Sequence, residues 1–143
     1  MTRKNGQGQC DKCDRTFGYY LINNGLNESC YAYCFRCGMT AVMDTNYEDR
    51  TSEGLPRHRS ITLKGERYLA PCVCGGAFKA GAAPRCPHCD QGLSATAASS
   101  WIEEEAPGAK EGWKWQNDWE SLYAIVIDQR LMKNPWKLGP SRT

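Results

Sequence analysis

Eight of the nine cysteines lie in four closely spaced pairs, and this spacing constrains the chain more than any other feature. The pairs are C-x-x-C at residues 10–13 and 34–37, C-x-C at 72–74, and C-x-x-C at 86–89. Each such turn directs two sulfur atoms to one point, and two turns can complete a tetrahedron around a metal ion. The sequence therefore predicts two four-cysteine metal sites.

Pairs that are neighbours along the chain are expected to share a site. Twenty residues separate the first two pairs, enough for an intervening hairpin, and eleven separate the last two. Four thiolates leave no coordination position open, so each site is predicted to hold one structural zinc ion. The predicted ligands are Cys10, Cys13, Cys34 and Cys37 for one site, and Cys72, Cys74, Cys86 and Cys89 for the other.

Disulfides are not the expected use of these thiols. Residues 1–9 carry positive charge with no apolar segment behind them, so no signal peptide is recognised. The longest apolar run, residues 122–127, is too short to span a bilayer. We therefore expect a cytoplasmic protein whose thiols stay reduced.

The paired cysteine turns resemble the zinc-ribbon, or rubredoxin-like, group of folds over roughly residues 9–44 and 68–92. The resemblance implies small β modules held by metal, and it says little about function, because ribbons serve many processes. The C-x-C pair is tighter than the usual knuckle, but Gly75 and Gly76 follow it and allow an unusual turn. A rubredoxin-like electron carrier, with iron in place of zinc, is a less favoured alternative.

Aromatic and β-branched residues predict strands over residues 16–22, 30–34 and 40–44, the first two joined by a hairpin turn at Asn24-Gly25. Residues 61–70 are interpreted as a strand or short hairpin feeding the third cysteine pair.

The C-terminal third is predicted to contain one short helix over residues 94–108 and a Trp-rich β-hairpin around 122–132, although helical spacing is also present there. The fold class is thus a small metal-stabilised mainly-β protein with two zinc-ribbon-like modules. The predicted divisions are a first ribbon at 1–44, a polar linker and strand at 45–67, a second ribbon at 68–93, and a packed C-terminal segment at 94–143.

Two residues near the knuckles have competing interpretations. Cys30, the ninth cysteine, is expected to pack as a small apolar group, although it could replace Cys34 as a ligand or be a reactive thiol. His88 is expected on the surface of its knuckle, with replacement of one sulfur ligand as the alternative.

Two aromatic stripes could be core or interface. Tyr31, Tyr33 and Phe35 alternate with Cys34 along one strand, and Phe17 and Tyr19 begin a second stripe. Such rings could stack on bases or contact a partner. Internal packing, for instance against the C-terminal tryptophans, is favoured. Those tryptophans are Trp113, Trp115, Trp119 and Trp136.

The net charge is only +2, but the charges are unevenly distributed. Residues 50–89 are basic and residues 103–128 are acidic, and the two blocks are expected to offset each other in part within the fold. Basic side chains beside the cysteines are expected to offset the negative thiolates. They are Lys12, Arg15, Arg36, Lys79, Arg85 and His88.

No Gly-rich phosphate loop, nucleophile elbow or H-E-x-x-H motif is present, so we expect a protein that is not an enzyme. The predicted function is binding of a protein partner, as an adapter, accessory subunit or inhibitor, with no small-molecule substrate and no membrane. Nucleic-acid binding through the basic 50–89 stretch and the aromatic face is the alternative. In that case Arg57, Arg59, Lys64 and Arg67 should face solvent.

Overall fold

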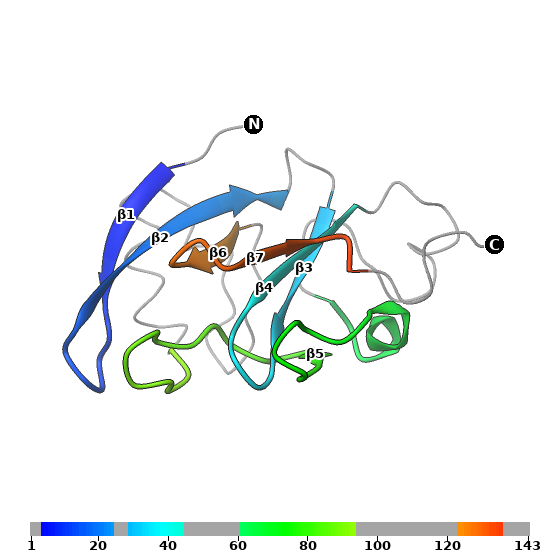
Figure 1. Cartoon of the computed structure of the whole chain (residues 1–143). Coiled ribbons are helices and arrows are strands. Elements are labelled where there is room, and N and C mark those ends of the chain that lie inside the picture. The colour runs from blue at the N-terminus through cyan, green and yellow to red at the C-terminus, as the bar shows by residue number, and fades with distance from the viewer. Residues whose placement is uncertain (1–3, 25–28, 45–60, 94–122, 136–143) are drawn as a thin grey trace.

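The computed structural model describes residues 4–24, 29–44, 61–93 and 123–135 (Figure 1). The described parts contain seven strands and one 3₁₀ helix, so the prediction of a mainly-β protein is confirmed. In chain order the elements are β1 (Lys4–Gln9), β2 (Thr16–Asn23), β3 (Ser29–Cys34), β4 (Thr40–Asp44), η1 (Lys64–Tyr68), β5 (Phe78–Lys79), β6 (Tyr123–Ile127) and β7 (Leu131–Lys133).

The strands form two sheets. One sheet has the order β1-β2-β6 and is antiparallel throughout. The other has the order β5-β3-β4-β7, in which only the β4–β7 pair is parallel. Each sheet therefore takes one strand from the segment after residue 122, so residues 123–133 belong to the fold.

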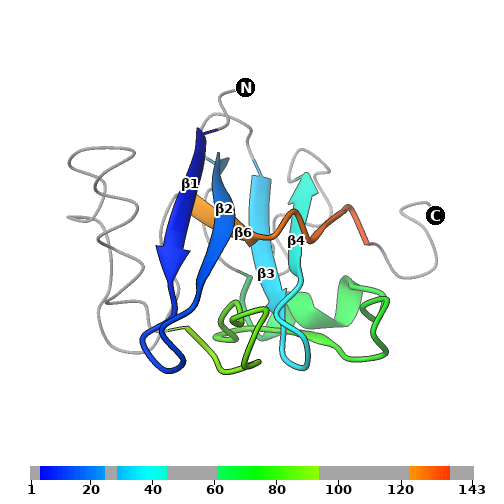
Figure 2. The same ribbon diagram turned by 60° about the vertical axis from the view of Figure 1, so that its left-hand side comes forward.

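Two hairpins, β1–β2 and β3–β4, carry the first two cysteine pairs at their tips. Figure 2 shows both tips at the same end of the molecule, where the segment that follows η1 also lies. Strands β2, β3 and β4 form where the sequence predicts them. Strand β1 was missed, because its sequence KNGQGQ has no β-forming side chains and becomes a strand by pairing with β2.

The predicted hairpin across Asn24-Gly25 is wrong. Strand β2 pairs with β1 and β6, whereas β3 pairs with β4 and β5, so the chain changes sheet between residues 23 and 29. The physical reason is that β2 pairs with β1 over six residues and with β6 over five, and β3 pairs with β4 over five, so the local turn signal does not outweigh these ladders.

The predicted C-terminal hairpin is also wrong, although its turn forms. Asp128 and Gln129 both have positive φ, at 53° and 61°, and the Arg130 N–H donates to the Ile127 carbonyl at 3.0 Å. This is the pattern of a type I′ turn, which usually joins two paired strands. Here β6 pairs with β2 while β7 pairs with β4, so the turn passes the chain from one sheet to the other.

Side chains of the second sheet explain why β6 does not pair with β7. The Ile125 N–H donates to the Tyr33 hydroxyl at 3.0 Å, and the Thr40 hydroxyl donates to the Ile125 carbonyl at 2.8 Å. These two contacts, from β3 and β4, satisfy main-chain groups of β6 that a hairpin partner would otherwise bond. All four side chains from Ala124 to Ile127 are buried, so β6 joins the two sheets.

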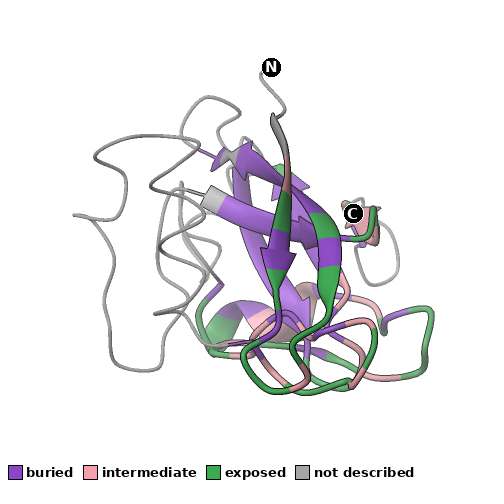
Figure 3. Ribbon diagram, turned by 90° about the vertical axis from the view of Figure 1, so that its left-hand side faces the viewer, coloured by how far each residue is buried: buried purple, intermediate pink, exposed green. Residues whose placement is uncertain are grey.

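The aromatic stripes are mostly core, as favoured. Tyr31 and Tyr33 are buried and meet edge to face, with ring centroids 5.6 Å apart, and Phe17 and Tyr19 are buried with them. Figure 3 shows the strands mostly buried and the loops below them partly exposed. Phe35 is the exception, with 63% of its side chain exposed.

Residues 61–70 fold differently from the prediction of a strand, because η1 occupies their centre. The polar linker at 45–60, the short helix at 94–108 and the four C-terminal tryptophans lie outside the described residues, and the predicted domain boundaries stay a prediction. Within the described ranges, no helix is long and apolar enough to cross a membrane.

Candidate metal centres

The eight paired cysteines come together in two groups of four, and within each group the sulfur atoms all lie within 4.8 Å of one another. Each group could hold a metal ion. We name the group that includes the β1–β2 tip site one, and the group that includes the β3–β4 tip site two. Site one consists of Cys10, Cys13, Cys86 and Cys89, and site two consists of Cys34, Cys37, Cys72 and Cys74.

This grouping corrects the predicted assignment, in which neighbouring pairs shared a site. The first pair joins the fourth, and the second joins the third, so the sites are nested along the chain. The reason lies in the topology, because the two hairpin tips belong to different sheets and do not converge. The segment from residue 69 to residue 93 instead passes alongside both tips and supplies a knuckle to each (Figure 2).

The sulfur separations suit tetrahedral coordination. Across site one, Cys10 lies 3.7 Å from Cys89, and Cys13 lies 3.7 Å from Cys86. The corresponding Sγ–Sγ distances across site two are both 3.6 Å. A tetrahedron with zinc–sulfur bonds of about 2.3 Å has edges of about 3.8 Å. A disulfide would need about 2.05 Å, so these are thiols arranged around a common point.

Backbone N–H groups point at one sulfur atom in each knuckle. The N–H of Lys12 donates to the Cys10 sulfur, that of Arg36 to Cys34 and that of His88 to Cys86, each at 3.3 Å. Such donors stabilise a thiolate, because the hydrogen bond favours the charged form. The backbone of each turn thus stabilises a thiolate, which is the form that binds a metal cation.

The three C-x-x-C knuckles share one turn. In each, the N–H of the first cysteine bonds to the carbonyl five residues later, and its carbonyl accepts from the N–H four residues later. The residue at that fourth position has positive φ, namely Asp14, Gly38 and Asp90 in the three turns.

The C-x-C knuckle is the same turn shortened by one residue. The Cys72 N–H bonds to the Gly76 carbonyl, four residues on, and its carbonyl accepts from Gly75, whose φ is +94°. The thiol that receives a backbone N–H is now the second one, because Gly76 donates to the Cys74 sulfur at 3.3 Å. The two glycines expected to permit an unusual turn therefore both take part in it.

Gly76 also allows the two knuckles of site two to meet. A Cβ at this position would lie 2.5 Å from the Cβ of Arg36 and 3.0 Å from the Cys34 sulfur. Any side chain would push the knuckles apart, so glycine is required by close packing and not by its backbone angles.

The thiol pKa values differ within each group. Burial acts to raise the pKa of Cys10, but backbone N–H groups of Cys13 and Lys12 act the other way and bring it to about 7. Burial also acts to raise the pKa of Cys74, but the Gly76 N–H and hydrogen bonds from the other three thiols of site two together lower it to about 7. Burial instead raises the pKa of Cys72 to about 12. Four adjacent thiols cannot all lose their protons unless a cation compensates the charge, which is what a bound metal does.

Arg85 connects the two centres. It immediately precedes Cys86 of site one, and its Nη2 donates to the Phe35 carbonyl in a knuckle of site two at 2.9 Å. Its Nη1 donates to the Asp90 carbonyl at 2.7 Å, within the fourth knuckle. The two centres therefore share one guanidinium that is bonded to knuckle backbone on both sides.

The other basic residues mostly contact main-chain oxygens. Lys12 donates to the Gly92 carbonyl, and Arg36 donates to the Cys74 carbonyl within site two. The His88 ring lies 2.8 Å from the Thr16 carbonyl, which supports its expected place on the knuckle surface. Lys79 departs from its expected role, because it pairs with Glu66 at 3.6 Å.

Cys30 belongs to neither group. It is fully buried in the second hydrophobic cluster, and this burial raises its pKa from 9.0 to about 12. The expectation that it packs as an apolar group is therefore confirmed.

The sequence from residue 6 to residue 94 matches the model of a protein family described as a domain of unknown function, DUF8255. The chain belongs to the DUF8255 family. The matched region contains all eight thiols of the two sites but not β6 or β7. No curated protein and no solved structure matches the chain significantly.

One surface feature of this DUF8255 chain escaped the sequence analysis. Among the described residues, three large hydrophobic side chains stay exposed. They are Phe35 at 63%, Leu63 at 78% and Val73 at 75%. Two of them, Phe35 and Val73, lie between paired cysteines of site two, and the third lines a pocket with Gly75 and Gly76, which follow that site. The signal was the identity of the residues between the paired cysteines. In site two they include the apolar Phe35 and Val73 beside Arg36, whereas in site one they are polar or proline.

Proposed function

We propose that this protein is a non-enzymatic binding protein, cytoplasmic as expected from its reduced thiols, in which two structural zinc ions hold the knuckles and the surface over site two contacts a partner protein. The observation that carries the proposal is the exposure of Phe35 and Val73 at the tips of both knuckles of site two.

Two physical arguments support a structural role for zinc. Each site offers four thiols, and four thiolates complete the coordination of zinc with no position left for water or substrate. Each site also joins segments more than 30 residues apart, so bound metal would contribute folding free energy, on the order of 10 kcal/mol per site.

Exposed apolar side chains over a rigid metal knuckle favour a protein partner. A folded chain usually buries large hydrophobic groups, and the exposed ones that gather in one region are typical of interaction sites. The equivalent positions of site one hold Asp11 and Lys12 in one knuckle and Pro87 and His88 in the other, so the proposed contact surface belongs to site two.

The test is capture of partners from a lysate of the native host by the zinc-loaded full chain, with and without nuclease. We expect nuclease-resistant capture that is lost in the double variant Phe35→Asp, Val73→Asp. Asp11→Lys, at the equivalent knuckle position of site one, is the matched control and should capture the same proteins. Capture that survives the double variant, or that nuclease abolishes, would remove the support for this proposal.

Nucleic-acid binding is the second candidate, favoured by an exposed ring, Phe35, beside exposed Arg36, with Lys64 and Arg67 also exposed. Arg57 and Arg59 lie outside the described residues. If Lys64 and Arg67 contact phosphates, their replacement by Ala should reduce the slope of log K against log salt by about 1.8 on duplex DNA, since each contact contributes about 0.9. Under the preferred proposal, DNA binding is weak in both proteins and the slope is unchanged.

A further inference from the structure

We infer that a groove beside site two is the docking site for an extended acidic segment of the partner protein. This inference rests on the proposed function and specifies the chemistry of the partner. The groove has a volume of about 470 Å³ and lies between η1 and the chain that leads from site two into β5. Its walls include Leu63 and Arg67 on one side, and Pro71, Ala77 and Lys79 on the other.

The apolar part of the groove suits a side chain from a partner. Leu63 is 78% exposed at the rim, whereas Leu69 and Phe78 are buried beneath it. An apolar side chain laid between them would cover Leu63 and remove surface from water, which is worth roughly 25 cal/mol per Å².

The sheet edge in the groove suits an extended main chain. Strand β5 is an edge strand of the four-stranded sheet, paired only with β3. In this ladder the Phe35 N–H donates to the Ala77 carbonyl, so the main-chain groups of Phe78 and Ala80 are directed away from β3. A strand edge that faces an open groove is a common place for a partner to add an extended segment.

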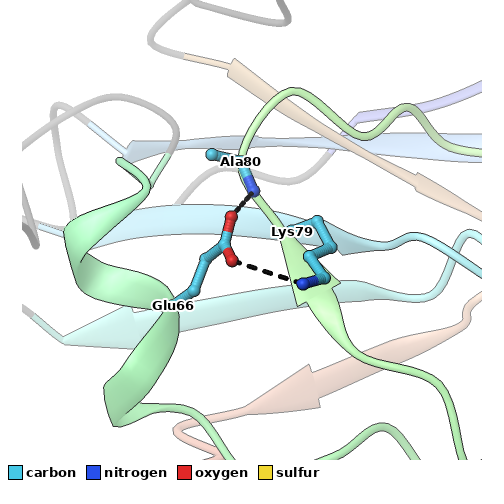
Figure 4. A network of polar contacts seen from close by, with 3 residues as sticks. All are labelled: Glu66, Lys79 and Ala80. Carbon is cyan, nitrogen blue, oxygen red and sulfur yellow. Dashed lines mark hydrogen bonds and ion pairs between the residues drawn. The ribbon is translucent and has the colours of Figure 1, made fainter.

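Glu66 occupies part of this edge and shows that the edge accommodates a carboxylate. Its carboxylate accepts from the Ala80 N–H at 2.8 Å and pairs with Lys79 at 3.6 Å (Figure 4). An acidic group is therefore already accommodated against this edge by one N–H and one ammonium. The arrangement shows that the edge is complementary to carboxylates.

The remaining charge at the groove is positive. Arg67 and Lys79 line the groove and are exposed, and Lys64 is exposed next to Leu63 in η1. Glu66, the acidic residue in the lining, is engaged as described. Arg36 lies over the second knuckle of site two, where it offsets the thiolates and is not counted here. A segment with acidic residues would gain from this surplus, mainly in its rate of association and its orientation.

The test uses the zinc-loaded full chain labelled with ¹⁵N and a fluorescent eight-residue peptide of alternating aspartate and valine. We expect saturable binding at low salt, with amide shifts concentrated between residues 63 and 80. The double variant Lys64→Glu, Arg67→Glu should weaken binding by about tenfold or more, since it replaces two attractions by repulsions. Leu63→Ser should weaken it severalfold. Lys133→Glu, on the opposite edge of the same sheet, is the matched control and should leave binding unchanged.

Several results would overturn the inference. They are no saturable binding below about millimolar peptide, equal binding of a lysine–valine peptide, or insensitivity to Lys64→Glu with Arg67→Glu. Tighter binding of an eight-nucleotide oligothymidine, lost in the same double variant, would assign the groove to nucleic acid. If the lysate partner is still captured by the groove variants but not by Phe35→Asp with Val73→Asp, the proposed function stands and the groove inference fails.

Discussion

Pairs of cysteine substitutions can decide whether the two metal sites are nested. Cys13 and Cys89 belong to one site in the structure, but to different sites if neighbouring pairs coordinate together. Cys10 and Cys37 have the opposite relation, because the structure places them in different sites. The double variant Cys13→Ser, Cys89→Ser should therefore retain about one zinc per chain, and Cys10→Ser, Cys37→Ser should retain none tightly bound.

The same nesting predicts how stability changes. Losing one structural zinc removes on the order of 10 kcal/mol of apparent folding free energy, which is comparable with the total stability of a typical domain. Cys13→Ser alone should therefore lower the melting temperature strongly. Adding Cys89→Ser should cost little more, because the metal it would help to hold is already lost, whereas adding Cys37→Ser should remove the second site.

The two sites close loops of different length, but the difference in closure entropy is too small to affect this test. The facing cysteines of site one are 73 and 79 residues apart, and those of site two are 35 and 40 apart. Doubling a loop costs only about 0.6 kcal/mol of closure entropy. This is small beside the free energy of binding a zinc ion, so neither site is expected to form only because the other has shortened its loop.

The direct assay is zinc per chain by native mass spectrometry, supported by cobalt substitution, in which sulfur-to-cobalt absorption counts intact four-thiolate sites. Our reasoning would be refuted if Cys13→Ser with Cys89→Ser held no metal while Cys10→Ser with Cys37→Ser held one. A wild-type protein with fewer than two tightly bound metals would refute both groupings.

Three further predictions concern single residues. Gly76→Ala places a methyl 2.5 Å from the Arg36 Cβ and should destabilise the protein by about 1–3 kcal/mol. It should also weaken zinc binding at site two, measured by chelator titration. Gly81→Ala is the control: its φ of +82° is strained but no neighbour lies within 4 Å, so it should cost about 1–2 kcal/mol and leave zinc affinity unchanged. Burial raises the pKa of Cys30 from 9.0 to about 12, so its stabilising contribution is present below pH 9 and is lost as pH rises towards 12, by up to about 4 kcal/mol. Urea unfolding at several alkaline pH values should show a flatter decline in Cys30→Ala. Cys74 is exposed, whereas the other candidate ligands are buried or half-buried, so alkylating reagents should react with it first and release the metal of site two. Mass spectrometry of the modified peptides identifies the first cysteine to react, and earlier modification of Cys89 would contradict this prediction.

The sequence predicts the knuckles well because a knuckle is a local structure. A C-x-x-C turn needs only its own backbone hydrogen bonds and a residue at positive φ four positions after the first cysteine, such as Asp14 or Asp90. Strands β2, β3 and β4 are also predicted, since Tyr31, Tyr33 and similar residues favour extended backbone, whereas β1 is not. All eight candidate ligands fall in the two thiol groups for the same reason.

The pairing of knuckles was not predictable from spacing, because it depends on which strands share a sheet. The spacing along the chain favours sites made from neighbouring cysteine pairs. Strand β2 instead pairs with β6, which lies about a hundred residues later, and the two hairpins belong to separate sheets. The decisive contacts are the hydrogen bonds between the Ile125 main chain and the hydroxyls of Tyr33 and Thr40. No local sequence pattern predicts these contacts.

The nested arrangement has a consequence for the proposed contact surface. Each site takes two thiols from the first 37 residues and two from the segment after residue 71, so no continuous stretch limited to either part contains a complete site. Phe35 and Val73, which come from the two parts, are brought together where the four thiols of site two meet. Arg85 then ties the Phe35 backbone to the knuckle of site one. The exposed apolar tips are therefore presented by a framework that joins both parts of the chain at the two thiol groups. Under the proposed function, partner binding should then depend on bound zinc, and removing the metal with a chelator should abolish capture of the partner.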